Sequence, residues 1–132
     1  MPDEWDVLVV DDEPVVRDGI RLLLRAAGLR VAAVADAETA LGHPAADSCR
    51  LVLCDLMLPG LSGIDLLRKL RTLRPGLPVV MITGYGTAEN AARALEAGVS
   101  GFLPKPFTES ELLTVVQGAL RGEGAVPGGK SS

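Results

Sequence analysis

The stretch Asp6-Val-Leu-Val-Val-Asp-Asp-Glu-Pro14 joins a short apolar run to an acidic turn and a proline. Apolar residues then recur at helical spacing, at positions 16, 20, 23, 24 and 27, and Gly28 follows. Proline is common in the first turn of a helix, and glycine is common just after its end. The pattern therefore predicts a strand over 6–10, an acidic turn, and a helix over 14–27.

The same alternation of apolar run and helical pattern repeats along the chain. It predicts four more strands and four more helices. The last helix has the clearest start, a capping box formed by Thr108 and Glu111, whereas Gly42 and Pro44 should end the second helix early. The further strands are expected over 30–34, 51–54, 79–83 and 101–103, and the further helices over 36–41, 62–73, 88–97 and from 109 onward.

The composition indicates one domain with an aliphatic core. The chain has 132 residues, of which 48% are hydrophobic and only 3% aromatic, and this length is near the commonest domain size. Uniformly apolar strands that alternate with helices are typical of a parallel α/β sheet covered on both faces. We expect a domain over 1–121 and a flexible tail or linker over 122–132, where glycines and a proline show no periodic pattern.

Charge and cysteine content exclude several classes of protein. A net charge of −4 and a pI near 4.9 argue against direct nucleic-acid binding, which requires a basic face. Cys49 and Cys54 form no CxxC pair, and His43 is the one histidine, so neither a disulfide framework nor a zinc site is indicated.

No leader pattern opens the chain, and the uncharged stretch 75–88 is shorter than the ~18 apolar residues of a spanning helix. We expect a cytoplasmic protein with no membrane contact, and His43 in a solvated loop.

The candidates for chemistry stand where the predicted strands end. Ligands of open α/β sheets bind beyond the carboxyl ends of the strands, so residues that follow different strands should meet at one edge. The polar residues at this edge are Asp11, Asp12 and Glu13 after the first strand, Asp55 after the third, Thr83 at the end of the fourth and Lys105 after the fifth.

Gathered carboxylates repel one another unless a cation neutralises them. Mg²⁺ accepts one or two carboxylates together with phosphate oxygens and waters, and we expect Asp11, Asp12 and Asp55 to hold it with the backbone carbonyl of Met57. A carboxylate can also attack phosphorus to form an aspartyl-phosphate. In this interpretation Asp55 is the nucleophile and Mg²⁺, for which Mn²⁺ can substitute, neutralises the phosphoryl oxygens.

Lys105 and Thr83 would each hold a further phosphoryl oxygen. Each residue alone has an ordinary structural explanation. The acidic residues before Pro14 could cap the first helix through its macrodipole, Asp55 could belong to a turn before Pro59, and Thr83 could simply end a strand. The conjunction of four elements at one edge is what favours phosphoryl transfer.

The chain also resembles the receiver domains of two-component response regulators over about residues 6–121. The resemblance rests on four stretches that lie at the ends of the predicted strands. They are Val9-Val-Asp-Asp-Glu13, Leu53-Cys-Asp-Leu-Met-Leu-Pro-Gly60 with Gly63, Met81-Ile-Thr-Gly84, and Phe102-Leu-Pro-Lys-Pro-Phe107.

This resemblance implies a flavodoxin-like three-layer α/β/α sandwich, with a five-stranded parallel sheet of order 2-1-3-4-5 and five helices. It implies Asp55 as phosphoacceptor, Lys105 as phosphate-binding lysine before a cis proline, and Thr83 with Phe102 as switch residues. Met57 and Tyr85 would flank the access route of the phosphate.

The resemblance also implies partners. A sensor histidine kinase or a histidine phosphotransfer protein would donate the phosphoryl group. The output face, and a homodimer interface, would comprise the helix 88–97, the strand 101–103 and the last helix. Such a domain is a switch rather than an enzyme, since it catalyses only its own phosphorylation and dephosphorylation.

Three alternatives stay open from the residues. An aspartate-nucleophile phosphatase of the dehalogenase type would need a D-x-D motif after the first strand, where Asp11-Asp12-Glu13 stands. A flavin- or nucleotide-binding module would need a Gly- or Ser/Thr-rich phosphate loop there. A receiver that works by docking alone would not need the full residue set.

Overall fold

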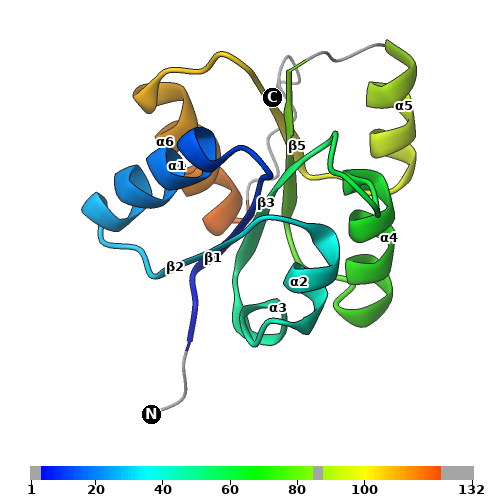
Figure 1. The fold of residues 1–132 in the computed structure, drawn as a ribbon, viewed down its shortest axis with the longest axis horizontal. Helices are drawn as coiled ribbons and strands as arrows, with labels where there is room; N and C mark the ends of the chain where they lie inside the picture. Colours follow the sequence, from blue (N-terminus) through cyan, green and yellow to red (C-terminus); the bar gives the residue numbers. More distant parts are fainter. Residues whose placement is uncertain (1–3, 85–87, 123–132) are drawn as a thin grey trace.

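A computed structural model describes residues 4–84 and 88–122 and shows a parallel sheet between two layers of helices (Figure 1). Its five strands run in the order β2-β1-β3-β4-β5, so the predicted fold class and strand order are confirmed. The strands are β1 (Val7–Val10), β2 (Val31–Val34), β3 (Leu51–Asp55), β4 (Val79–Thr83) and β5 (Gly101–Pro104).

The helices divide between the two faces of the sheet, as Figure 1 shows. One face carries α1 (Pro14–Ala26) and α6 (Glu109–Leu120). The other carries α2 (Ala37–Gly42), α3 (Ala45–Ser48), α4 (Gly63–Leu73) and α5 (Ala88–Glu96). Each face has its own buried aliphatic cluster, and alternate residues of the central strands point into one or the other.

Local signals place the ends of several helices. Gly28 has φ 90° just beyond α1, a conformation that glycine adopts without steric cost. The predicted capping box is present at α6, where the Thr108 hydroxyl accepts the Glu111 amide and the Glu111 carboxylate accepts the Thr108 amide. A second capping box at α4 uses Ser62 and Asp65; there an aspartate takes the place of the usual glutamate or glutamine.

The segment between β2 and β3 holds one helix more than predicted. The prediction of five helices is wrong for this segment, because the described residues form α2 and then a separate single turn, α3. Pro44 ends α2 as expected, but its φ of −55° suits a helix start, so it becomes the N-cap of α3. The Ala45 amide donates to His43 Nδ1 at 2.9 Å. His43 thus lies in the loop between α2 and α3, as predicted, but it is half-buried and its Nδ1 is hydrogen-bonded rather than solvated.

The amino edge of the sheet is held by a buried carboxylate. Oδ2 of Asp6 accepts the Arg30 amide at 2.8 Å, and Oδ1 lies 3.3 Å from Nη1 of Arg50. The Asp6 carbonyl also accepts the Arg50 amide at 2.9 Å. Burial alone would raise the pKa of Asp6, but the Arg30 amide and the two guanidinium groups outweigh it and lower that pKa. This edge fixes β1 against the starts of β2 and β3.

Within the described residues, none of the helices has the length and apolar character needed to cross a bilayer.

Candidate functional site

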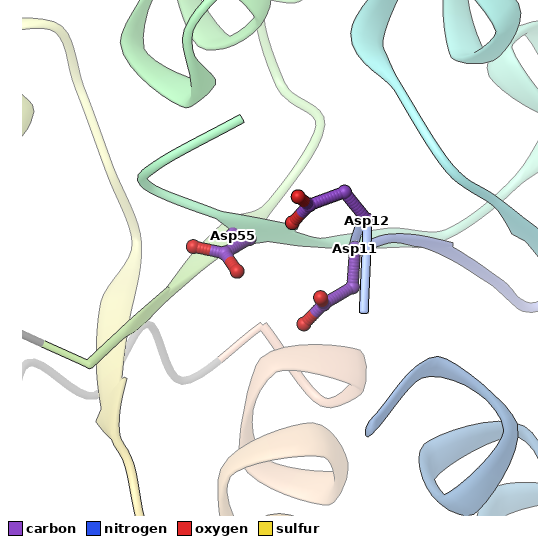
Figure 2. Close-up of side chains that lie close together, drawn as sticks. All are labelled: Asp11, Asp12 and Asp55. Carbon is purple, nitrogen blue, oxygen red and sulfur yellow. The ribbon is translucent and has the colours of Figure 1, made fainter. Parts of the chain in front are cut away.

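Three carboxylates meet at the carboxyl edge of the sheet (Figure 2). Asp11 follows β1, Asp12 is the next residue, and Asp55 is the last residue of β3. One oxygen of each lies within 4.8 Å of the others. Asp11 and Asp55 are buried, whereas Asp12 is exposed. The central strands thus deliver the predicted acidic residues to one place.

The backbone around Asp55 is tightly packed. The Gly63 amide donates to the Leu56 carbonyl at 3.2 Å, so the start of α4 lies directly against the end of β3. A Cβ at Gly63 would stand 2.4 Å from the carbonyl oxygen of Asp55, closer than real atoms come. The Met57 amide donates to Asp55 Oδ1 at 2.9 Å. These contacts fix the Asp55 carboxylate, with Oδ2 facing Lys105.

The Asp11 loop is held by bonds on both sides. Asp11 Oδ1 accepts the Glu13 amide at 2.9 Å, and the Asp11 carbonyl accepts Nη1 of Arg17 at 2.9 Å. Glu13 is the N-cap residue of α1, yet its side chain makes no capping bond, and the first turn of α1 contains no acidic residue. A side-chain capping bond from Glu13 therefore does not account for the acidic residues before Pro14.

Lys105 links the acidic residues across the edge. Its Nζ lies 2.7 Å from Glu13 Oε1, 3.1 Å from Asp55 Oδ2 and 3.5 Å from Asp11 Oδ2. The peptide bond to Pro106 is cis, as expected from the resemblance. Partial burial disfavours the ammonium, but its bonds to Glu13 and Asp55 outweigh that and raise the pKa of Lys105. Lys105 is therefore a cation at neutral pH.

The buried carboxylates lack part of their neutralising charge. Burial raises the pKa of Asp11, and the nearby charges of Asp55 and Glu13 raise it further, against the opposing effects of the Glu13 amide and Lys105. Asp11 Oδ2 is buried, and among the described residues no group hydrogen-bonds to it. An inward-facing carboxylate oxygen of this kind, beside two other carboxylates, fits a hard divalent cation with oxygen ligands. The donor set therefore suits a metal site.

Thr83 and Phe102 line a second hollow next to the acidic site. This pocket of about 340 Å³ also contacts Ala88, Ala91 and Lys105. Thr83 ends β4, and Phe102 lies on the neighbouring strand, half-buried against the core on the α5 side. The two residues predicted as a switch are therefore neighbours of Lys105, whereas Tyr85 lies outside the described residues.

A larger groove of about 940 Å³ opens from the acidic site onto α1. At its polar end lie Asp12, Glu13, Asp55 and Lys105, and Met57, 62% exposed, flanks them. Its other end is apolar. The apolar lining comprises Val15, Val16, Ile20, Leu23, Pro106 and Phe107.

The sequence patterns did not reveal three contributions to the site. The sequence places Glu13 at the edge but indicates no role for it, although it makes the shortest of the three carboxylate contacts to Lys105. Arg17 anchors the Asp11 carbonyl from within α1, and on sequence alone it was one more polar residue of an amphipathic helix. Gly63 belongs to a stretch that carries the resemblance, but no sequence pattern indicates that it packs against the Asp55 backbone.

Comparisons with known proteins agree with this geometry. The family model described as the response regulator receiver domain matches residues 7–117. The C4-dicarboxylate transport transcriptional regulatory protein DctD of Pseudomonas aeruginosa is 40% identical over 117 residues, 89% of this chain and 25% of DctD. The response regulator protein TmoT of Ectopseudomonas mendocina is 34% identical over 92% of this chain and 56% of TmoT. The chain thus spans about a quarter to just over half of these curated relatives.

Solved structures of receiver domains also superpose closely on this chain. A CheY-like response regulator receiver domain protein from Methanospirillum hungatei superposes with a TM-score of 0.84 at 31% identity, covering 92% of this chain and 97% of that one. The receiver domain of NtrX from Brucella abortus superposes with a TM-score of 0.82 at 39% identity, covering 88% and 98%.

Proposed function

Because this chain belongs to the family of response regulator receiver domains, we propose that it accepts a phosphoryl group on Asp55 in a Mg²⁺-dependent reaction. The family is one of signalling modules rather than enzymes. Membership in it therefore argues against both the phosphatase and the flavin-module alternatives. The observation that carries the proposal is the position of the Asp55 carboxylate. It lies 3.1 Å from the Lys105 ammonium and within 4.8 Å of the carboxylates of Asp11 and Asp12.

The transfer step forms one bond and breaks one bond. A carboxylate oxygen of Asp55 attacks phosphorus, the bond from phosphorus to the donor's imidazole nitrogen breaks, and that nitrogen leaves with the bonding electron pair and takes up a proton. The Met57 amide holds Oδ1, so Oδ2 is the oxygen positioned for attack. Lys105 exchanges its contact with Asp55 for one with a phosphoryl oxygen, and Thr83 hydrogen-bonds to another.

The metal would be held by Asp11, Asp12, Asp55 and the backbone carbonyl of Met57. When bound, Mg²⁺ neutralises charge on the phosphoryl oxygens as the transition state forms, and Mn²⁺ can take its place. The buried Asp11 oxygen without a hydrogen-bond partner supports this set. The exposed Asp12 stands at the entrance, where it can bind the ion directly or through water.

The groove on α1 would receive the phosphodonor. A sensor histidine kinase or histidine phosphotransfer protein presents its histidine from a helix, and an apolar groove that leads to the acceptor accommodates such a helix. Val15, 85% exposed, and Phe107 offer apolar contact area on the two walls. A partner that spans this groove would bring its histidine to Asp55.

The output face would comprise α5, β5 and α6. Thr83 reports the phosphoryl group when its hydroxyl turns toward it, and Phe102 then turns into the pocket beside Ala88 and Ala91. The change alters the surface that an output domain, another partner or a second copy of this chain recognises. We place the chain in the cytoplasm, where the family's kinases present their phosphohistidine, and assign it no direct contact with nucleic acid or membrane.

The proposal is tested by incubation with Mg²⁺ and acetyl phosphate. The expected result is a gain in mass of one phosphoryl group that chelation of the metal prevents and that Asp55→Ala abolishes. An unlabelled wild-type protein would favour a receiver that works by docking alone, whereas label that survives Asp55→Ala would place the acceptor at another residue. Asp47→Ala, at an exposed carboxylate on α3, is the matched control and should be labelled normally.

A further inference from the structure

The closest partner of Lys105 is a carboxylate outside the acidic cluster. Glu13 Oε1 lies 2.7 Å from Nζ, against 3.1 Å for Asp55 and 3.5 Å for Asp11. The Glu13 side chain is 58% exposed, and it is not among the three carboxylates that could share a cation. It also makes no helix-capping bond. Its described contact is therefore with Lys105.

This contact spans the edge of the sheet. Glu13 lies at the start of α1 and Lys105 just after β5, and 92 residues separate them in the chain. Both line the mouth of the groove on α1, together with Asp12 and Met57. Glu13 therefore holds the ammonium at the entrance through which a phosphodonor must approach.

A phosphoryl group on Asp55 needs the same ammonium. Lysine presents one positive charge from a flexible stem, so a carboxylate at 2.7 Å and a phosphoryl oxygen compete for it. The fixed negative charge of Glu13 at the entrance also repels an anionic donor. Both effects favour the unphosphorylated state.

We propose that Glu13 is a positioning residue that holds Lys105 until the phosphoryl group arrives, and so limits how readily Asp55 is phosphorylated. This inference rests on the proposed function of Asp55. It assigns to Glu13 a role in restraining phosphorylation. Neither the three clustered aspartates nor the switch residues Thr83 and Phe102 supply that role.

The test compares Glu13→Gln with the wild-type protein at saturating Mg²⁺. Saturation matters because the Glu13 charge also attracts the cation. We expect Glu13→Gln to accept a phosphoryl group from acetyl phosphate about two- to fivefold faster, and to bind beryllofluoride tighter by a similar factor, the range that one exposed ion pair contributes. A gain in both the phosphorylation rate and the beryllofluoride affinity distinguishes this restraining role from a structural role. Loss of a structural contact would lower both.

Two further variants serve as controls. Asp18→Asn removes the same charge five residues further along the chain, on α1, where Asp18 pairs with Arg21 at 3.6 Å, and should leave both quantities unchanged. Glu13→Asp keeps the charge but shortens the side chain, and should fall between wild type and Glu13→Gln. An equal gain in Asp18→Asn would overturn the inference by assigning the effect to net charge.

The outcomes also separate the inference from the proposed function. If wild type is labelled at Asp55 but Glu13→Gln is labelled at the same rate or more slowly, the restraining role is wrong and the proposed function stands. If wild type and Glu13→Gln both remain unlabelled, the proposed function fails and the inference fails with it.

Discussion

The ammonium of Lys105 lies 3.1 Å from Oδ2 of Asp55 and joins the end of β3 to the segment after β5, 50 residues away in the chain. This contact places a positive charge beside the atom that we propose as the nucleophile. The same ammonium lies 3.5 Å from Asp11 Oδ2. Its positive charge therefore acts on two of the carboxylates that would bind a divalent cation.

Lys105→Met should therefore have opposite effects on metal and phosphate. Removal of the competing cation should tighten Mg²⁺ binding severalfold, because Asp11 and Asp55 lose a positive neighbour. Loss of a group that holds a phosphoryl oxygen should slow phosphorylation on the order of tenfold to a hundredfold. Mg²⁺ titration and labelling with acetyl phosphate measure the two effects. Lys69→Met, at an exposed position on α4, should change neither; weaker Mg²⁺ binding in Lys105→Met would contradict this account.

Gly63→Ala should destabilise the domain and the acceptor loop together. The new Cβ would stand 2.4 Å from the Asp55 carbonyl oxygen and 2.9 Å from the Leu56 Cα, so the end of β3 and the start of α4 must separate. We expect a loss of about 1–3 kcal/mol in the free energy of unfolding in urea. Gly19→Ala is the matched control, since a Cβ there meets no atom within 4 Å. Inside α1 it should gain about 0.5–1 kcal/mol. Equal stability of the two variants would refute the close approach.

Asp6 should make stability depend on acidic pH. Its pKa in the folded protein lies below the ordinary value of 3.8, so its contribution is complete above that value and is lost as pH falls through the lower, folded pKa. Asp6→Asn should lose about 1–3 kcal/mol near neutral pH, because it leaves the bonded Arg30 amide and the Arg50 guanidinium with weaker partners. Urea unfolding between neutral pH and pH values below 3.8 measures this. The difference between variant and wild type should shrink in acid; a constant difference would exclude the ionised carboxylate as its cause.

Ala91→Leu should separate phosphorylation from its read-out. Ala91 is half-buried and lines the pocket shared by Thr83 and Phe102, so a larger side chain there should occupy the space into which Phe102 would turn. Beryllofluoride should still bind, because Asp55 and Lys105 are untouched. In ¹⁹F NMR of fluorophenylalanine-labelled protein, the Phe102 resonance should move in wild type and stay in Ala91→Leu. A Phe102 shift of equal size in both proteins would contradict the proposed rotation.

The sequence predicted the edge where the site forms, but not the contacts within it. Apolar runs ending in Asp11, Asp55 and Thr83 are strong local signals, because parallel strands bring their carboxyl ends to one side. The Glu13–Lys105 pair depends on how two loops 92 residues apart approach each other, and no local pattern encodes that approach. The turn of α3 is also not predictable from local pattern, because Pro44 can either end a helix or begin one.

The most direct test of the central claim identifies the labelled residue. Wild-type protein is phosphorylated with acetyl phosphate and Mg²⁺, reduced with borohydride, which converts an aspartyl-phosphate to homoserine, and digested for tandem mass spectrometry. We predict homoserine at position 55, and none at 11 or 12. Homoserine at another carboxylate, with Asp55 unmodified, would contradict the assignment of Asp55 as the phosphoacceptor.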